Sequence, residues 1–210
     1  MNAPIVDPET TALLVMDFQT VVVEMIATDK EARLARAAAL VEGARKAGMR
    51  IIYVVVGFRA GYPEVSPRNR WFAELRGSGR FVEGSAGTEV HAALAPNPGD
   101  VVVTKHRVSA FAGTDLDMTL RANGIDTLVL AGLATSGVVL STVRHAADAD
   151  YRLVVVEDCC GDRDAEVHRM LVEKVFPRQA TVINSSELLA ALGTADPADG
   201  TGPPRGTRLP

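Results

Sequence analysis

Six short apolar runs alternate along this chain with longer stretches whose apolar residues recur at helical spacing, and this alternation constrains the fold more than any other feature. Short runs rich in Val, Ile and Leu are typical of strands buried on both faces. The sequence therefore predicts an α/β fold, in which a parallel sheet has helices covering both of its faces. The predicted strands are 11–18, 50–56, 101–104, 127–131, 152–156 and 180–183, and the predicted helices are about 31–47, 88–95, 115–123, 137–149, 165–175 and 186–192.

The length indicates how many domains to expect, and the charge limits the classes of binding partner. The 210 residues suit one domain, which we expect to span 1–192, followed by a flexible tail at 193–210 that is rich in Gly and Pro. The net charge of −4 includes no basic block, so nucleic acid and anionic membranes are not expected as partners. No apolar run approaches the roughly 20 residues that span a bilayer. The N-terminal sequence MNAPIVDPET lacks the pattern of a signal peptide, so we expect a cytoplasmic protein.

Common cofactor and metal motifs are missing from the sequence. The segment after the first predicted strand has neither the Gly-x-Gly-x-x-Gly pattern of dinucleotide sites nor a P-loop. The four histidines are scattered, and the two cysteines, Cys159 and Cys160, are adjacent and form no zinc pattern. Asp162, Asp164 and Glu166 lack the glycine of a calcium loop and are interpreted as an acidic helix start. The sequence predicts no metal and no cofactor, and two buried cysteines.

Three polar features follow predicted strands and are candidates for a site. Asp17 follows the apolar run of the first strand, Lys105 follows the third strand, and the fourth strand runs into the turn AGLATSG. If the strand order reverses beside the first strand, Asp17 and Thr135 flank a crevice, and Lys105 points the same way. An acid and a cation held close in a dry pocket can pass a proton, and the N–H groups of the turn can hold an anion. Each feature alone is also compatible with an ordinary turn or a solvated strand end.

The segment 57–87 is long and irregular, with Gly, Pro, Arg and aromatic residues. Long loops in compact domains are often lids or binding loops, and the alternative is a surface excursion or a subunit contact. Arg59, Arg68 or Arg70 could bind a substrate carboxylate with two hydrogen bonds, and the alternative for each is exposure to solvent.

Three segments in this order resemble the isochorismatase-like hydrolases, also called the cysteine hydrolase superfamily: ALLVMDFQ (12–19), VVVTKHRVSAFAGTDLDMTLRANGIDTLVLAG (101–132) and LATSGVVLSTVRHAADADYRLVVVEDCCGDRDAEVH (133–168). The resemblance implies a doubly wound, mainly parallel six-stranded sheet in three α/β/α layers, a small-molecule substrate, and a homo-oligomer, either a dimer or a tetramer. It also implies a site made of an aspartate, a lysine and a cysteine. Asp17 and Lys105 take the first two places, and Gln19 and Phe111 are expected to line the pocket.

The turn departs from the family pattern at one position. The family turn reads roughly Thr-x-x-Cys-Val-x-x-Thr, and Val138 stands here at the cysteine position, after Ala134, Thr135, Ser136 and Gly137. Many members have a cis peptide bond just before the threonine, which would be Ala134–Thr135. Amidases of this family, such as nicotinamidases, attack a carbonyl with the cysteine thiolate, which Val138 cannot do. The metal motif of nicotinamidases is missing as well.

Isochorismatases hydrolyse a vinyl ether without the cysteine, and the aspartate is their proposed acid. The resemblance therefore implies a hydrolase of a small carboxylated molecule, in which Asp17 supplies acid–base chemistry and Lys105 tunes and positions it. Two alternatives stay open. One is an amidase that uses Ser136 or Ser141 as its nucleophile, and the other is a member that has lost catalysis and binds a small molecule or a partner chain.

Overall fold

The computed structural model describes residues 6–26 and 29–193, and within them the chain forms one six-stranded sheet. Every pair of neighbouring strands is parallel, and the order across the sheet is β3-β2-β1-β4-β5-β6. The strands are β1 (Thr11–Met16), β2 (Arg50–Val56), β3 (Val101–Lys105), β4 (Thr127–Leu133), β5 (Arg152–Gly161) and β6 (Thr181–Ile183). The predicted doubly wound parallel sheet is confirmed.

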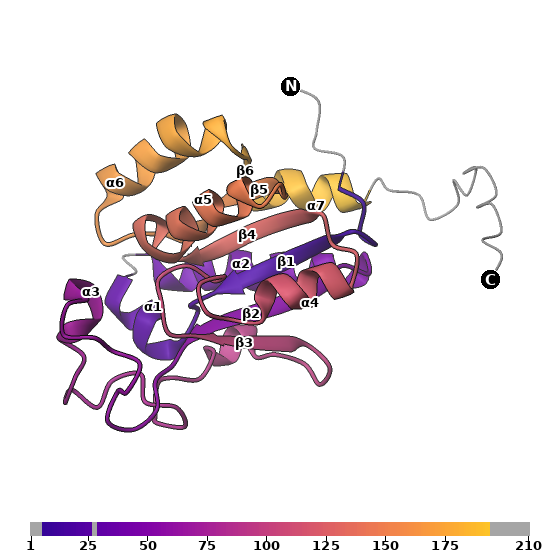
Figure 1. The fold of residues 1–210 in the computed structure, drawn as a ribbon. Coiled ribbons are helices and arrows are strands. Elements are labelled where there is room, and N and C mark those ends of the chain that lie inside the picture. Colours follow the sequence, from indigo (N-terminus) through magenta and orange to yellow (C-terminus); the bar gives the residue numbers. More distant parts are fainter. Residues whose placement is uncertain (1–5, 27–28, 194–210) are drawn as a thin grey trace, which may run out of the picture.

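Alternate residues of the central strand β1 face two separate cores. Leu13 and Val15 belong to one apolar cluster, and Leu14 and Met16 belong to the other, because successive side chains of a strand point to opposite faces. Figure 1 shows α2 and α4 on opposite sides of the sheet, which gives the three layers that were expected. One layer contains α1 (Thr20–Ile26), α2 (Lys30–Lys46) and α7 (Ser185–Gly193), and the other contains α4 (Leu116–Ala122), α5 (Leu140–Asp148) and α6 (Ala165–Met170).

The order of the strands reverses between β1 and β4, which lie side by side at the centre of the sheet. After β1 the chain enters α1, which packs on one face, and after β4 it enters α5, which packs on the other. The two connections diverge at this point, and a crevice forms there beyond the carboxyl ends of the strands.

The helices differ from the prediction in three places. The segment TVVVEMI forms α1, although its run of β-branched residues does not favour a helix. The predicted helix 88–95 is reduced to a single 3-10 turn, Ala92–Leu94, which Pro96 and Pro98 prevent from continuing. Within the segment 57–87, a short helix, α3 (Arg70–Ala73), forms where an irregular loop was expected.

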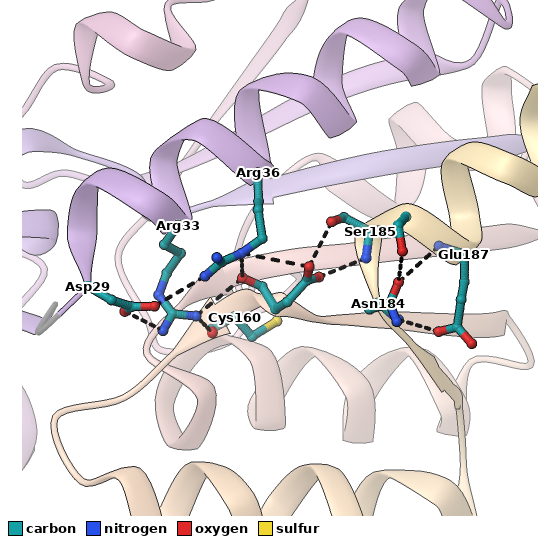
Figure 2. A network of polar contacts seen from close by, with 9 residues as sticks. Asp29, Arg33, Arg36, Cys160, Asn184, Ser185 and Glu187 are labelled. Carbon is teal, nitrogen blue, oxygen red and sulfur yellow. Dashed lines mark hydrogen bonds and ion pairs between the residues drawn. The ribbon is translucent and has the colours of Figure 1, made fainter.

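Strand β5 is longer than predicted because it bulges. Its pairing with β4 jumps from Leu130–Val155 to Gly132–Cys160, so β5 has extra residues between these pairs. Asp158 lies in the bulge, and its carboxylate accepts hydrogen bonds from the N–H and the hydroxyl of Ser185, at 2.8 and 2.7 Å. Figure 2 shows Arg33 and Arg36 of α2 reaching β5 at Cys160 and at Asp158, while Ser185 at the start of α7 binds Asp158. The bulge thus ties β5 to the helices of one layer.

The predicted tail at 193–210 lies outside the described residues, except for Gly193, which ends α7. Among the helices of the described part, none combines the length and the apolar character that a bilayer crossing requires.

Candidate active site

A cavity of about 710 Å³ opens beyond the carboxyl ends of β1, β3 and β4. Six of the predicted site residues line it, and they come from three different strand ends. These residues are Asp17, Lys105, Ala134, Ser136, Gly137 and Val138. The reversal of strand order therefore brings the candidate acid, the lysine and the turn to one space, as the sequence suggested.

Asp17 and Lys105 form a buried ion pair at the edge of this cavity. The Lys105 Nζ atom lies 2.9 Å from Asp17 Oδ2, and the side chains are only 3% and 9% exposed. Lys105 Nζ also donates a hydrogen bond of 3.2 Å to the carbonyl of Arg107. Asp17 adopts a left-handed backbone conformation, with φ 57°, which Asp tolerates better than most residues. This conformation ends β1 and lets the side chain lie across the end of β2 toward β3.

The two carboxylate oxygens of Asp17 have different surroundings. Oδ2 is bound to Lys105, whereas Oδ1 is buried and has no hydrogen-bond partner among the described residues. Burial raises the pKa of Asp17 above its usual value, and the charge and hydrogen bond of Lys105 counter this only in part. A buried carboxyl with one unpartnered oxygen is chemically able to carry a proton.

The turn after β4 contains a cis peptide bond between Leu133 and Ala134. The predicted position, Ala134–Thr135, was therefore wrong by one residue: the cis bond joins the last residue of β4 to the first residue after the strand. Ala134 itself is extended, and its carbonyl accepts hydrogen bonds from the N–H groups of Gly137 and Val139. These bonds close a wide helical turn, Thr135–Val139, that leads into α5.

Two residues of the segment that follows β5, Asp162 and His168, hold this turn in place. Asp162 Oδ2 accepts a hydrogen bond of 2.7 Å from the Ser136 N–H, and Thr135 Oγ1 lies 2.8 Å from His168 Nδ1. Burial, followed by the nearby charge of Arg33, lowers the pKa of His168. The prediction placed neither residue in the site. Asp162 was interpreted as part of an acidic helix start, but α6 begins at Ala165 with Asp164 as its cap, and Asp162 binds the turn instead. Asp162 could have been found by the argument used for Asp17, because both are polar residues that follow a strand.

Arg33 of α2 supports the segment that carries Asp162. Its guanidinium donates a hydrogen bond to the carbonyl of Cys160, and a second one of 2.8 Å to Asp29 (Figure 2). A Cβ atom on Gly161 would lie 2.9 Å from Arg33 Nε, so a larger residue there would require this arginine to shift. The end of β5 is thus fixed by a helix on the face away from α5.

The comparison with known families agrees with this geometry, because a family model described as the Isochorismatase domain matches residues 11–187. The chain belongs to the isochorismatase family. It is 33% identical over 199 residues to an uncharacterised isochorismatase family protein, YecD, of Escherichia coli O157:H7, covering 88% of this chain and 97% of the relative. It is 29% identical over 185 residues to a maleamate amidohydrolase of Pseudomonas putida, covering 86% of each chain.

A solved structure of this family has the same fold. An isochorismatase family protein from Burkholderia thailandensis superimposes with a TM-score of 0.79 at 29% sequence identity, covering 92% of this chain and all of the other. The protein is therefore an isochorismatase-family hydrolase that acts on small molecules, as expected from its sequence.

Four of the residues proposed for the site do not line the cavity. Thr135 is fully buried. Gln19 is also fully buried, and its side chain hydrogen-bonds the backbone of Val56 and Thr88. Phe111 stacks on His145 with the ring centroids 4.7 Å apart. Arg59 forms an ion pair with Glu64, and its side chain is 70% exposed.

The segment 57–87 contributes a wall of the cavity. Of the three arginines named from this segment, Arg70 lines the cavity, together with Arg80, which was not predicted. Arg163, which follows β5, is the other arginine among the lining residues of the described part. This placement favours the interpretation of the segment as a binding loop.

The serines and cysteines that were considered as nucleophiles differ in whether they line the cavity. Ser136 lines the cavity, whereas Ser141 lies on α5 and does not. Cys159 and Cys160 are fully buried, which confirms the prediction for them, and burial raises the pKa of Cys160 to about 12. Within residues 6–26 and 29–193, no group of three or more His, Cys, Asp or Glu side chains is placed to hold a metal ion.

Proposed function

We propose that this hydrolase cleaves a small carboxylated molecule by proton transfer through Asp17, without a covalent intermediate. The observation that carries the proposal is the asymmetric environment of the Asp17 carboxyl group. Lys105 holds Oδ2 at 2.9 Å, while the buried Oδ1 has no partner in the described part of the chain. An acid held in this way can present its proton to a bound substrate, and its raised pKa keeps it protonated to a higher pH.

The reaction for which this arrangement suffices is the hydrolysis of a vinyl ether. Asp17 gives its proton to the terminal carbon of the C=C bond, which leaves an oxocarbenium ion and a carboxylate. Water adds to the cationic carbon and loses a proton to the Asp17 carboxylate, so the acid is restored. The hemiketal then collapses, its hydroxyl proton passes to the departing oxygen, and an alcohol and a ketone are released. Lys105 holds the carboxylate in place throughout.

Val138 favours this reaction over amide hydrolysis. Its side chain is 2% exposed and lines the cavity at the position that the family pattern gives to a cysteine. An amide needs a stronger nucleophile than a vinyl ether does, and no cysteine is among the described residues that line the cavity. The maleamate amidohydrolase of P. putida is named for an amide substrate. An amidase reaction here would depend on Ser136.

The substrate carboxylate is proposed to bind to the cavity arginines. Arg163 lines the cavity and directly follows Asp162, whose carboxylate binds the Ser136 N–H. A guanidinium can bind a carboxylate with two parallel hydrogen bonds. Arg70 and Arg80, from the segment 57–87, are the other candidates.

The test is to incubate the purified protein with isochorismate and to follow the release of pyruvate. Wild type and Asp115→Asn should both release pyruvate, because Asp115 is exposed and outside the cavity. Asp17→Asn should lose roughly 10²- to 10⁴-fold in rate, which is the usual contribution of a general acid. Maleamate in a parallel assay tests the amidase alternative, and Ser136→Ala would then abolish the activity. Binding of these acids without turnover would overturn the proposal in favour of a binding protein.

We also propose that the protein is a cytoplasmic homo-oligomer, either a dimer or a tetramer. The support is the family resemblance, since oligomers are common among these hydrolases. Light scattering on the purified protein measures the assembly, and the mass of a single chain would contradict the proposal. Cell fractionation tests the location.

A further inference from the structure

The residues that line the cavity include both charged and apolar side chains. Asp17, Lys105 and Asp162 come from the segments at the strand ends. From α1 and α3, apolar side chains also line the cavity, and two of these, Met25 and Trp71, are 37% and 66% exposed. Large apolar side chains left open to water at a cavity mouth mark a surface that gains stability when a ligand covers it.

Trp71 is held at the cavity by a folded segment. Its neighbour Phe72 is buried and packs edge-to-face on Phe58, with the ring centroids 5.4 Å apart. The side chain of Asn69 accepts a hydrogen bond of 3.3 Å from the Phe72 N–H and thereby caps α3. Successive residues of a helix point about 100° apart, so anchoring Phe72 inward directs Trp71 outward. The exposure of Trp71 is therefore fixed by the packing of its own segment.

We propose that the substrate is an amphipathic carboxylate, whose apolar or aromatic body packs against Trp71 and Met25 while its polar end faces Asp17 and Lys105. This inference rests on the proposed function for the location of the reacting end. A cavity of about 710 Å³ lies within the range of about 300–1,000 Å³ that is typical of sites for drug-sized ligands. It has room for a body of aromatic size beside the acid.

The two side chains suit this task for different reasons. Trp71 offers a broad, rigid face on which a ring can stack. Met25 is unbranched and polarisable, so it adapts to ligands of different shape. The arginines among the lining residues, including Arg70 next to Trp71, supply positive charge for a carboxylate. Affinity should therefore require both the charge and the apolar body.

The chain contains a single tryptophan, so intrinsic fluorescence reports on Trp71 alone. We would titrate wild-type protein with three probes that cannot react: propionate, hydrocinnamate, which is propionate with a phenyl ring, and hydrocinnamyl alcohol, which lacks the charge. Hydrocinnamate should bind roughly tenfold or more tightly than either of the others, because the ring is removed from water and the charge is paired. It should also shift the Trp71 emission to shorter wavelength.

Calorimetry on variants tests where the phenyl ring of hydrocinnamate binds. Trp71→Ala and Met25→Gln should each weaken hydrocinnamate binding about tenfold and leave propionate binding unchanged. Met118→Ala is the matched control, because Met118 is 68% exposed on α4 and does not line the cavity. Equal affinity for propionate and hydrocinnamate, or unchanged binding in both cavity variants, would overturn the inference.

These measurements are independent of turnover. Failure of the probes to bind at Trp71 and Met25 would leave the pyruvate assay with wild type and Asp17→Asn unaffected. Conversely, tight binding of hydrocinnamate to a protein that releases no pyruvate would support the apolar subsite and contradict the proposed reaction.

Discussion

The Oδ2 atom of Asp162 accepts a hydrogen bond of 2.7 Å from the backbone N–H of Ser136, and it thereby joins the segment after β5 to the turn after β4. The bond between Thr135 and His168 joins the same two segments a few residues away. The turn that lines the cavity is therefore positioned from outside, by side chains of a neighbouring strand connection.

Asp162→Ala should lower kcat more than it raises KM, because the turn loses its position while the arginines that we propose to bind the substrate remain. The free energy of unfolding should fall by about 1.5–3 kcal/mol, the usual contribution of a hydrogen bond to a charged group. Asp162→Asn, which keeps an acceptor oxygen, should restore most of the activity. Steady-state kinetics and urea unfolding provide the two measurements.

Asp164→Ala is the control for this prediction. Asp164 caps α6 by accepting hydrogen bonds from the N–H groups of Glu166 and Val167, and it does not line the cavity. Its loss should cost about 0.5–2 kcal/mol of stability with little change in kcat. An equal loss of kcat in both variants would show that Asp162 acts only through stability.

Lys105→Met should move the alkaline limb of the pH–rate profile to higher pH. The charge and hydrogen bond of Lys105 lower the pKa of Asp17, so their removal raises that pKa further. The reactive form is the protonated acid, and activity is lost as the pH rises through this pKa. The variant should be slower at every pH, but its remaining activity should persist to higher pH. A limb that moves to lower pH would contradict Asp17 as the acid.

Val138→Cys should introduce the one thiol of the folded protein that reacts with iodoacetamide. Cys159 and Cys160 are buried and have raised pKa values, so native wild type should remain unmodified. A cysteine at position 138 would line the cavity. Mass spectrometry should show one added group on the variant, and none on the control Val143→Cys, whose position is buried in α5. An unmodified Val138→Cys variant would contradict access from the cavity to this position.

Gly132→Ala should destabilise the fold by about 1–3 kcal/mol, because overpacking forces its neighbours to shift. A Cβ atom at this position would lie 3.0 Å from Met16 Cβ and 3.1 Å from the Met16 carbonyl oxygen, and a backbone atom cannot easily give way. Gly193→Ala, where a Cβ atom would have nothing within 4 Å, should change stability little. Urea unfolding measures both variants, and equal midpoints would contradict the expected clash.

The strands were predictable because their apolar runs are strong local signals. The predicted strand 50–56 coincides with β2. The predicted strand 152–156 stops before the end of β5 because Glu157 and Asp158 interrupt the apolar run. Their place in a bulge depends on contacts with α2 and α7. Likewise, α1 forms from a β-branched segment because Val22 and Val23 pack on the sheet, which local propensity cannot reveal.

The candidate site also has a part that the sequence predicts and a part that it does not. The meeting of Asp17 and Lys105 follows from strand order, and the sequence patterns were sufficient to suggest it. The position of Trp71 depends on how Phe72 packs on Phe58 within the segment 57–87, and no local pattern encodes that path. The roles proposed for Asp17 and Lys105 stay predictions until turnover is measured.

The central position of the crevice has a thermodynamic consequence. Val22 belongs to the apolar cluster on one face of the sheet and Val138 to the cluster on the other, and both line the cavity. A molecule that fills the cavity would thus contact both apolar clusters and connect the two helical layers. Because a ligand that binds only the folded state raises the melting temperature, a library of small acids could be ranked by thermal shift before any reaction is known.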